Sequence, residues 1–241
     1  RMDDYLKSKY GTLSPLPVPA DPSASQPLVR VENPPAVQVL IPGFSVHALP
    51  IDLPNINNVL YRPDGKLIAL GYDGNLWLLS DSDGDGLEDI STIFWKNNGQ
   101  LQSPIGMDLT PTGFLGGDGV FVASKGKCSL ILDSDGDGQA DQERVIADGW
   151  KTLDHTVDAL GVAVDPSDGS VYFGRGTSNY TNAYDIDDQG QSKFQIDDER
   201  GTILRVSPDF ETREIVATGI RFPVGLRFNR DGQLFCTDQE G

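Results

Sequence analysis

The chain is short of cysteine, of basic residues and of long apolar runs. Its two cysteines, Cys128 and Cys236, form no C-x-x-C-H motif, which excludes a c-type haem attached within these residues. The sequence leaves open whether the two thiols pair. Lysine and arginine total 19 against 36 aspartates and glutamates, giving a formal net charge of −17 that excludes nucleic acids and anionic membrane surfaces as partners. No apolar run approaches the roughly 18 residues of a membrane span.

Helical patterning is scarce too. Residues 1–10 resemble the tail of a helix, but no apolar stripe with helical spacing exceeds two turns after them. Seven prolines between residues 11 and 36 predict an extended linker without a core of its own. We therefore expect an N-terminal segment and proline-rich linker over residues 1–36, followed by one β domain over residues 37–241.

Within this β domain, one pattern recurs four times: a strand, a turn containing Pro, Asp or Gly, and a second strand. Its starts are separated by 48, 55 and 64 residues, and an acidic insertion near residues 179–200 explains the longest spacing. About four strands per repeat of roughly 45–55 residues is typical of a propeller blade. The sequence thus predicts an all-β partial propeller of about four blades, three complete and one begun. The repeats start at Asn58, Gly106, Gly161 and Gly225.

Two acidic loops of pattern D-S-D-G-D-G-x-x-D begin 52 residues apart. Carboxylates at positions 1, 3, 5 and 9 can converge on one Ca²⁺, the glycine at position 6 permits the sharp turn, and the carbonyl of position 7 adds a ligand. Strand-like flanks place each loop in a β-hairpin rather than an EF-hand. The predicted ligands are Asp81, Asp83, Asp85, Leu87 and Asp89 in the first loop and Asp133, Asp135, Asp137, Gln139 and Asp141 in the second.

The alternative for these loops is an ordinary Asp/Gly turn with solvated charges, although a cation would relieve the repulsion between four carboxylates. Loops of this kind suit millimolar extracellular calcium, which favours a periplasmic or secreted location. The chain begins with Arg1 and stops at Gly241 inside a motif, so we expect a piece of a longer protein in which the absence of a visible signal peptide means little.

Two segments resemble a known family. The run GIRFPVGLRF (residues 219–228), followed by GQLFCTDQEG (232–241), resembles the G-x-R-N-P-x-G-L-x-F…G-x-L-x-x-x-E-x-G stretch of soluble quinoprotein glucose/sorbosone dehydrogenases. These are six-bladed propellers that carry pyrroloquinoline quinone (PQQ) over a central channel. The run DHTVDALGVAVDP (154–166) is similar to their catalytic-histidine segment. The similarity covers residues 40–241, and its specific part lies within 150–241.

The resemblance implies a PQQ-dependent oxidation of a sugar or other polyol. His155 would match the general base that takes the proton of the C1 hydroxyl, and Arg221 would match the arginine that contacts the quinone. Both are expected to line one end of the channel. The backbone around Gly241 would match a turn that helps to hold the active-site calcium. The last five residues also resemble the branch fused to a c-type cytochrome, which implies an external or fused haem as electron acceptor.

The pattern departs from the family at Phe222, where the family has asparagine, so a polar cofactor contact is missing. The aspartate loops are additional to the PQQ-calcium site and are similar to the cation loops of integrin-type propellers. His155 could instead be a hydrogen-bonded structural residue, and Arg221 could pin a loop beside the channel. The alternative function is therefore a non-catalytic, calcium-dependent propeller that binds carbohydrate or protein. Phe222 favours that alternative, whereas Arg221 together with His155 favours the enzyme.

Overall fold

The computed structural model describes residues 37, 39–114, 116–151, 158–177, 188–191 and 196–239. The chain divides into two compact units, Arg1–Val46 and His47–Gly241. Within the described residues, fourteen strands form three four-stranded sheets and one two-stranded sheet, and the only helix is the 3₁₀ turn η1 (Ile196–Asp198). No helix in this part of the chain is long and apolar enough to cross a membrane. The predicted all-β fold is confirmed.

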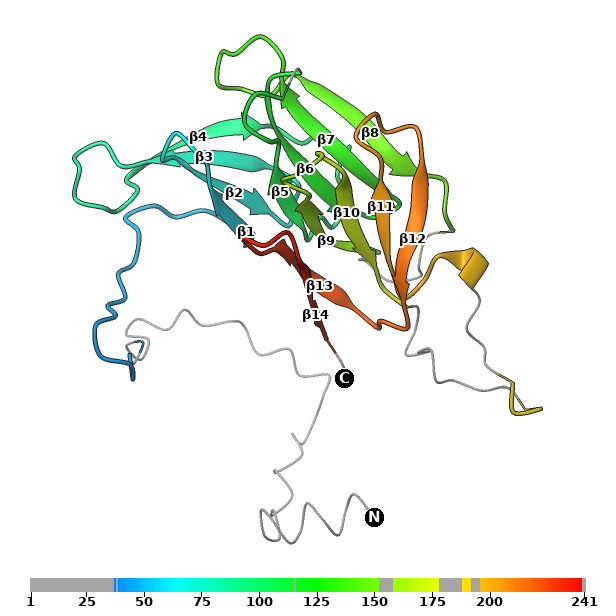
Figure 1. Ribbon diagram of the computed structural model, residues 1–241. Helices are drawn as coiled ribbons and strands as arrows, with labels where there is room; N and C mark the ends of the chain where they lie inside the picture. The colour runs from blue at the N-terminus through cyan, green and yellow to red at the C-terminus, as the bar shows by residue number, and fades with distance from the viewer. Residues whose placement is uncertain are drawn as a thin grey trace, which may run out of the picture. The chain divides into compact units, whose positions relative to one another are not determined.

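Strand order in every sheet follows the chain, so all neighbours are antiparallel hairpin partners (Figure 1). We call the sheets blades 1 to 4. Blade 1 contains β1 (Ile56–Tyr61), β2 (Leu67–Gly71), β3 (Leu76–Ser80) and β4 (Ile90–Trp95). Blade 2 contains β5 (Met107–Leu109), β6 (Asp118–Ser124), β7 (Lys127–Asp133) and β8 (Gln142–Asp148). Blade 3 contains β9 (Ala159–Val164), β10 (Val171–Arg175), β11 (Thr202–Val206) and β12 (Arg213–Thr218), and blade 4 contains β13 (Pro223–Phe228) and β14 (Leu234–Asp238).

The turn between the first two strands of each blade contains a glycine in the left-handed region of backbone space. The φ angles of Gly65, Gly113, Gly169 and Gly232 are +86°, +79°, +81° and +73°. A side chain at these positions would be strained, because Cβ clashes with the backbone when φ is positive. The Pro/Asp/Gly signal therefore marks four equivalent turns, as the repeat predicted.

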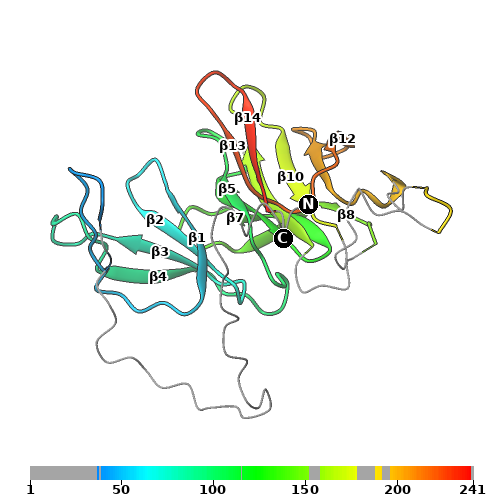
Figure 2. The same cartoon turned by 90° about the horizontal axis from the view of Figure 1, so that it is seen from below.

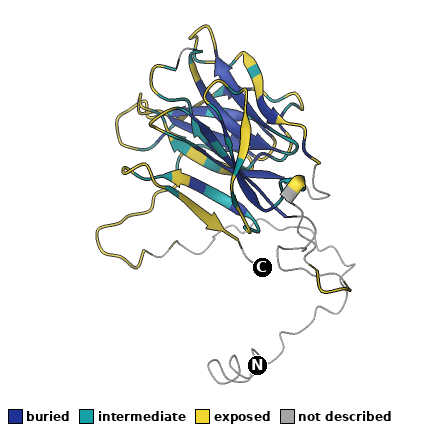
Figure 3. Cartoon of the chain, turned by 45° about the vertical axis from the view of Figure 1, so that its right-hand side comes forward, coloured by how far each residue is buried: buried dark blue, intermediate teal, exposed yellow. Residues whose placement is uncertain are grey.

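Successive sheets lie next to one another (Figure 2), their strands are largely buried (Figure 3), and apolar residues fill the spaces between them. Between blades 1 and 2 the core includes Phe94, Leu70 and Ile131, and between blades 2 and 3 it includes Phe121 and Phe173. All five side chains are fully buried. This burial contributes roughly 25 cal/mol for each Å² of apolar surface removed from water.

The outward face of blade 1 is covered by the chain that leads into it. Leu49, Ile51 and Leu53 pack against the buried residues Leu67 and Leu79. Blade 4, by contrast, contains two strands within the described residues, and β14 is largely exposed along its length (Figure 3). The four sheets therefore form a partial propeller.

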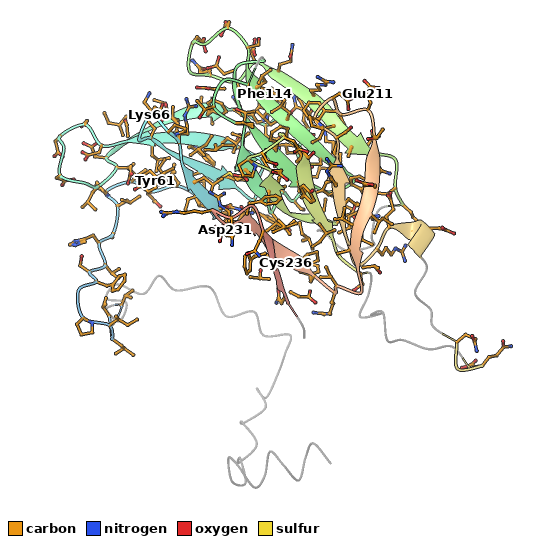
Figure 4. The ribbon with its side chains drawn as sticks, in the orientation of Figure 1. Tyr61, Lys66, Phe114, Glu211, Asp231 and Cys236 are labelled. Carbon is orange, nitrogen blue, oxygen red and sulfur yellow. The ribbon has the colours of Figure 1, made fainter. Side chains whose placement is uncertain are left out.

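Both cysteines are free thiols. Cys128 is buried in the core between blades 2 and 3, whereas Cys236 is exposed on β14 (Figure 4). Burial raises the pKa of the Cys128 thiol. The pairing that the sequence left open is therefore absent.

Two of the three glycines that begin repeats, Gly106 and Gly161, let neighbouring first strands approach closely. A Cβ on Gly106 would lie 2.1 Å from the carbonyl oxygen of Leu160, and one on Gly161 would lie 2.7 Å from the carbonyl oxygen of Val224. These two glycines thus face the backbone of the next blade, whereas Gly225 faces the Thr237 side chain of its own blade. In blade 1 the equivalent position is Asn58, whose side-chain amide donates to the Ile105 carbonyl at 3.2 Å.

We predict that Gly161→Ala lowers the free energy of unfolding by about 1–3 kcal/mol or more, because backbone atoms of β13 cannot rotate away from the added methyl. Gly116→Ala is the matched control, since its new Cβ would meet only side-chain atoms of Phe114 and Leu132. Urea denaturation followed by circular dichroism measures both. Equal effects would contradict this account of the repeat glycine.

Candidate functional site

The antiparallel topology gives the blades two different ends. The turns after β1, β5, β9 and β13 and the loops after β3 and β7 lie at one end, which we call the turn end. The links that lead into β9 and β13, and the turns after β10 and β14, lie at the other, the loop end. The two aspartate loops therefore lie at the turn end, whereas Arg221, just before β13, lies at the loop end.

In the first aspartate loop, a net of backbone amides holds the carboxylates. Asp81 accepts hydrogen bonds from the amides of Gly84 at 2.7 Å and Gly86 at 2.8 Å. Asp83 and Asp85 accept bonds from the amides two residues further on, the latter from Leu87. The ligating oxygens of Asp81, Asp83 and Asp85 all lie within 4.8 Å of one another.

The second loop repeats this geometry. Asp133 accepts bonds from Gly136 at 2.8 Å and Gly138 at 2.9 Å, and Asp137 accepts a bond from the amide of Gln139. The oxygens of Asp133, Asp135 and Asp137 again lie within 4.8 Å of one another. Two loops with the same predicted ligands thus have the same convergent carboxylates. As predicted, each joins two strands of a hairpin, β3 to β4 and β7 to β8.

The ninth-position aspartates close the loops. Asp89 accepts bonds from the amide and hydroxyl of Ser82, at 2.8 and 2.5 Å, and Asp141 does the same with Ser134 at 3.1 and 2.7 Å. The serine hydroxyl bonds lower the pKa of both carboxyls, so both are ionised near neutral pH. The structure therefore gathers positions 1, 3 and 5 into one group, and position 9 braces it.

Each loop is also tied to blade 1. The Tyr61 hydroxyl (Figure 4) donates to the buried Glu88 carboxylate at 2.7 Å, which holds the first loop against β1. That bond is the main cause of the raised pKa of Tyr61. In the second loop, the amide of Ala140 donates to the carbonyl of Phe94 in β4 at 2.6 Å. The second loop therefore bridges blades 2 and 1.

At the loop end, Asp238 fixes the backbone on which Arg221 lies. Its carboxylate accepts bonds from the amides of Arg221 at 3.2 Å and Phe222 at 2.7 Å. The half-buried Arg221 donates from Nη1 to the carbonyl of Gln239 at 2.8 Å, and its own carbonyl accepts a bond from the amide of Thr177. The link before β13 is therefore joined to the chain after β14 and after β10.

The departure at Phe222 has a packing explanation. A Cβ on Gly176 would lie 2.9 Å from the Phe222 ring and 3.3 Å from a Leu160 methyl. The ring therefore lies against the backbone just after β10. An asparagine here would lose this apolar contact, so Phe222 belongs to the packing of the loop end.

A buried ion pair lies beside this link. The side chains of Asp158 and Arg175 are both 0% exposed, and Arg175 Nη2 lies 2.9 Å from Asp158 Oδ1. Asp158 Oδ2 accepts a bond from the Trp150 indole at 2.6 Å and another from the amide of Gly126 at 3.1 Å. Desolvation lowers the pKa of Arg175, and the charge of Asp158 opposes that change.

Arg175 joins three separate pieces of the loop end. It donates to the carbonyl of Lys151 at 3.1 Å and to the carbonyl of Asp198 at 2.7 Å, in addition to Asp158. Lys151 and Asp158 flank the segment that contains His155. His155 and Gly241 themselves lie outside the described residues.

Sequence reasoning missed Asp158, Arg175 and Asp238. One signal was available, because a charged residue that ends the apolar strand β10 must find a buried partner. The identity of that partner could not be read from spacing, since Asp158 lies 17 residues away.

The topology, the repeat glycines and the two ends define the class of protein: a β-propeller-type fold, present here as a partial ring. Within this class, the chain belongs to the family described as Domain of unknown function (DUF7133), which matches residues 61–241. No curated protein matches its sequence.

Solved structures share the fold. The iodide structure of the Trichoderma reesei carbohydrate-active enzyme of family AA12 aligns with a TM-score of 0.65 at 14% identity over 88% of this chain and 52% of its own. The PQQ domain of Coprinopsis cinerea pyranose dehydrogenase aligns with a TM-score of 0.60 at 16% identity over 76% and 43%. PQQ-bound aldose sugar dehydrogenase from Streptomyces coelicolor aligns with a TM-score of 0.55 at 18% identity, over 78% of this chain and 57% of its own. The chain thus spans about half the length of these proteins.

We predict that Asp158→Ala lowers the free energy of unfolding by about 3–5 kcal/mol, because it leaves the Arg175 charge buried without a partner. The control is Glu214→Ala, which breaks an ion pair with Arg205 whose side chains are 62% and 30% exposed. That change should cost less than about 1 kcal/mol. Chemical denaturation of both variants tests the difference, and a similar small loss for each would be incompatible with a dominant buried pair.

Proposed function

We propose that this chain is the partial propeller of a PQQ-dependent sugar or polyol dehydrogenase. The observation that carries the proposal is the Arg221 link, which Asp238 and Thr177 hold at the loop end of a fold shared with quinoprotein sugar dehydrogenases. Likeness at 14–18% identity supports the fold alone, so the activity rests on the residues of this link.

The donor set of Arg221 suits an anionic, oxygen-rich quinone. Arg221 is half-buried, and among the described residues its guanidinium donates to one carbonyl, so further N–H donors remain for cofactor oxygens. Bound PQQ would supply the hydride acceptor, which no side chain can provide. Arg221 would hold the cofactor and stabilise negative charge on its oxygens, and the backbone around Gly241 would help to hold its calcium.

His155 is proposed as the general base. A neutral imidazole near pH 7 can accept the proton of a sugar hydroxyl at Nε2 or Nδ1. The bonds from Arg175 to Lys151 and Asp158 fix both flanks of its segment at one buried point.

We further propose that both aspartate loops bind Ca²⁺ and stabilise the hairpins that carry them. Three convergent carboxylates in each copy supply the hard oxygen ligands that Ca²⁺ prefers, and the carbonyls of Leu87 and Gln139 would add to them. A periplasmic or secreted location, with its high calcium, fits this proposal. Electrons would pass to a c-type cytochrome, either fused or separate.

The second candidate is a non-catalytic, calcium-dependent propeller that binds carbohydrate or protein. Phe222 favours it, because its ring is used for packing against Gly176 and offers no polar group to a cofactor. A propeller fold can support either role.

If the loops bind Ca²⁺, the chelator EGTA should lower the melting temperature. A cation that binds only the folded form adds about 2.7 kcal/mol at a hundredfold excess over its Kd. Asp83→Asn and Asp135→Asn should each remove the calcium response of one loop. Asp231→Asn, an exposed aspartate of the β13–β14 turn (Figure 4), should leave it intact. An identical melting temperature with and without calcium would refute the metal proposal.

If the enzyme proposal holds, the full-length protein loaded with PQQ and calcium should reduce a redox dye when given aldoses or polyols. His155→Ala should slow this reaction by about 10²–10⁴-fold, the usual contribution of a positioned base. His47→Ala, the other histidine of the chain, is the matched control and should keep full activity. Failure to bind PQQ, measured by its absorbance after gel filtration, would favour the binding-module alternative.

A further inference from the structure

The turn end contains a pocket that takes no part in the proposed oxidation. Its volume is about 470 Å³, within the range of small-molecule sites. The ends of three neighbouring first strands form it: Asp108 from β5, Val164 from β9, and Arg227 with Phe228 from β13. The pocket therefore lies where blades 2, 3 and 4 meet, at the end opposite Arg221.

Asp108 forms the polar base of this pocket. Its side chain is 13% exposed, and Oδ1 accepts bonds from Arg227 Nη1 at 2.9 Å and from the Leu109 amide at 3.0 Å. Oδ2 accepts a bond from the amide of Val164 at 2.9 Å. Burial raises the pKa of Asp108, while the amide of Val164 and the charge of Arg227 oppose that rise. With these bonds made, Asp108 has little capacity left to accept from a ligand.

Arg227 differs from other paired arginines of the chain. Its side chain is 65% exposed and, in the part of the chain that the structure describes, donates to Asp108 alone. Arg62, in the neighbouring turn of blade 1, bonds both Asp64 and Asp118, and Arg213 bonds Glu199 twice and the carbonyl of Asp148. A guanidinium has five N–H donors in a planar fork. The buried carboxylate of Asp108 therefore orients the Arg227 guanidinium, and the remaining N–H groups can donate to a ligand.

The lining of the pocket determines which kind of anionic ligand fits. Pro111, Pro166 and Phe228 line it, so part of its surface is apolar. A planar carboxylate matches the guanidinium fork in a bidentate manner. A phosphate dianion would bring a second negative charge close to Asp108 in a chain whose net charge is −17. A singly charged acid with an organic body suits this combination best.

We propose that this turn-end pocket binds a small organic monocarboxylate, with Arg227 donating to the ligand's carboxylate and Asp108 acting as the positioning residue for Arg227. The site is independent of the PQQ proposal, because it lies at the opposite end of the blades and shares no residue with the Arg221 link.

Isothermal titration calorimetry of the whole chain with sodium benzoate, sodium acetate and inorganic phosphate tests the proposal. Benzoate should bind more tightly than acetate, because its ring can contact Phe228 and the prolines, and phosphate should bind most weakly. Arg227→Gln should weaken benzoate binding about ten- to hundredfold, the change expected on loss of a charged hydrogen-bonding group. Arg230→Gln, an exposed arginine two residues beyond β13, should change it by less than about twofold.

Two outcomes would overturn the site: benzoate affinity that does not change in Arg227→Gln, or phosphate binding as tight as that of benzoate. A second measurement needs no variant. In the unaltered protein, nuclear Overhauser contacts between benzoate protons and the Phe228 ring are expected, and their absence at saturating benzoate would exclude binding in this pocket. Asp108→Asn should also weaken benzoate, since a neutral amide holds the guanidinium less firmly.

Discussion

Burial of apolar side chains between successive sheets is the interaction on which the rest of this structure depends. Every residue of β2, and nearly every residue of β6 and β7, is buried, because both faces of these middle strands are covered. Antiparallel sheets more often have one face toward water. Here a blade gains stability only when another blade, or the Leu49–Leu53 segment, covers its second face.

Because apolar side chains fill the space between blades, the polar side chains that could bind a ligand lie at the two ends of the blades. Inner strands that touch through glycine leave little space for a ligand between blades, as the approach of Gly161 to Val224 shows. The turn end is regular, because four equivalent turns and two equivalent loops follow the repeat. The loop end is irregular, since each link must reach the next blade. Its backbone is therefore held by individual side chains such as Asp238 and Arg175.

Much of the turn end could be predicted from the sequence, because its signals are local. The aspartate loops satisfy their backbone amides with partners close by in the sequence, as Asp81 does with Gly86 and Asp89 with Ser82, seven residues apart. The loop end could not be predicted in this way. Its pair Asp158 and Arg175 is 17 residues apart. The turn-end pair Asp108 and Arg227, which the local signals also miss, is 119 residues apart. Such pairs exist only after the blades have packed, and no periodicity in the sequence marks them.

Three arginines show how burial and partners give one residue type different roles. Arg175 is fully buried, bonds a carboxylate and two carbonyls, and so serves as an internal anchor. Removing its partner would leave a charge buried and unpaired in a low-dielectric core, so Arg175 contributes to the stability of the fold. Among the described residues, the side chains of Arg221 and Arg227 each donate to a single partner, a carbonyl and a carboxylate respectively, at opposite ends of the blades. Their charges remain accessible, so N–H donors that the fold leaves unused can bond a ligand. Ligand binding is therefore expected at these two positions rather than at Arg175.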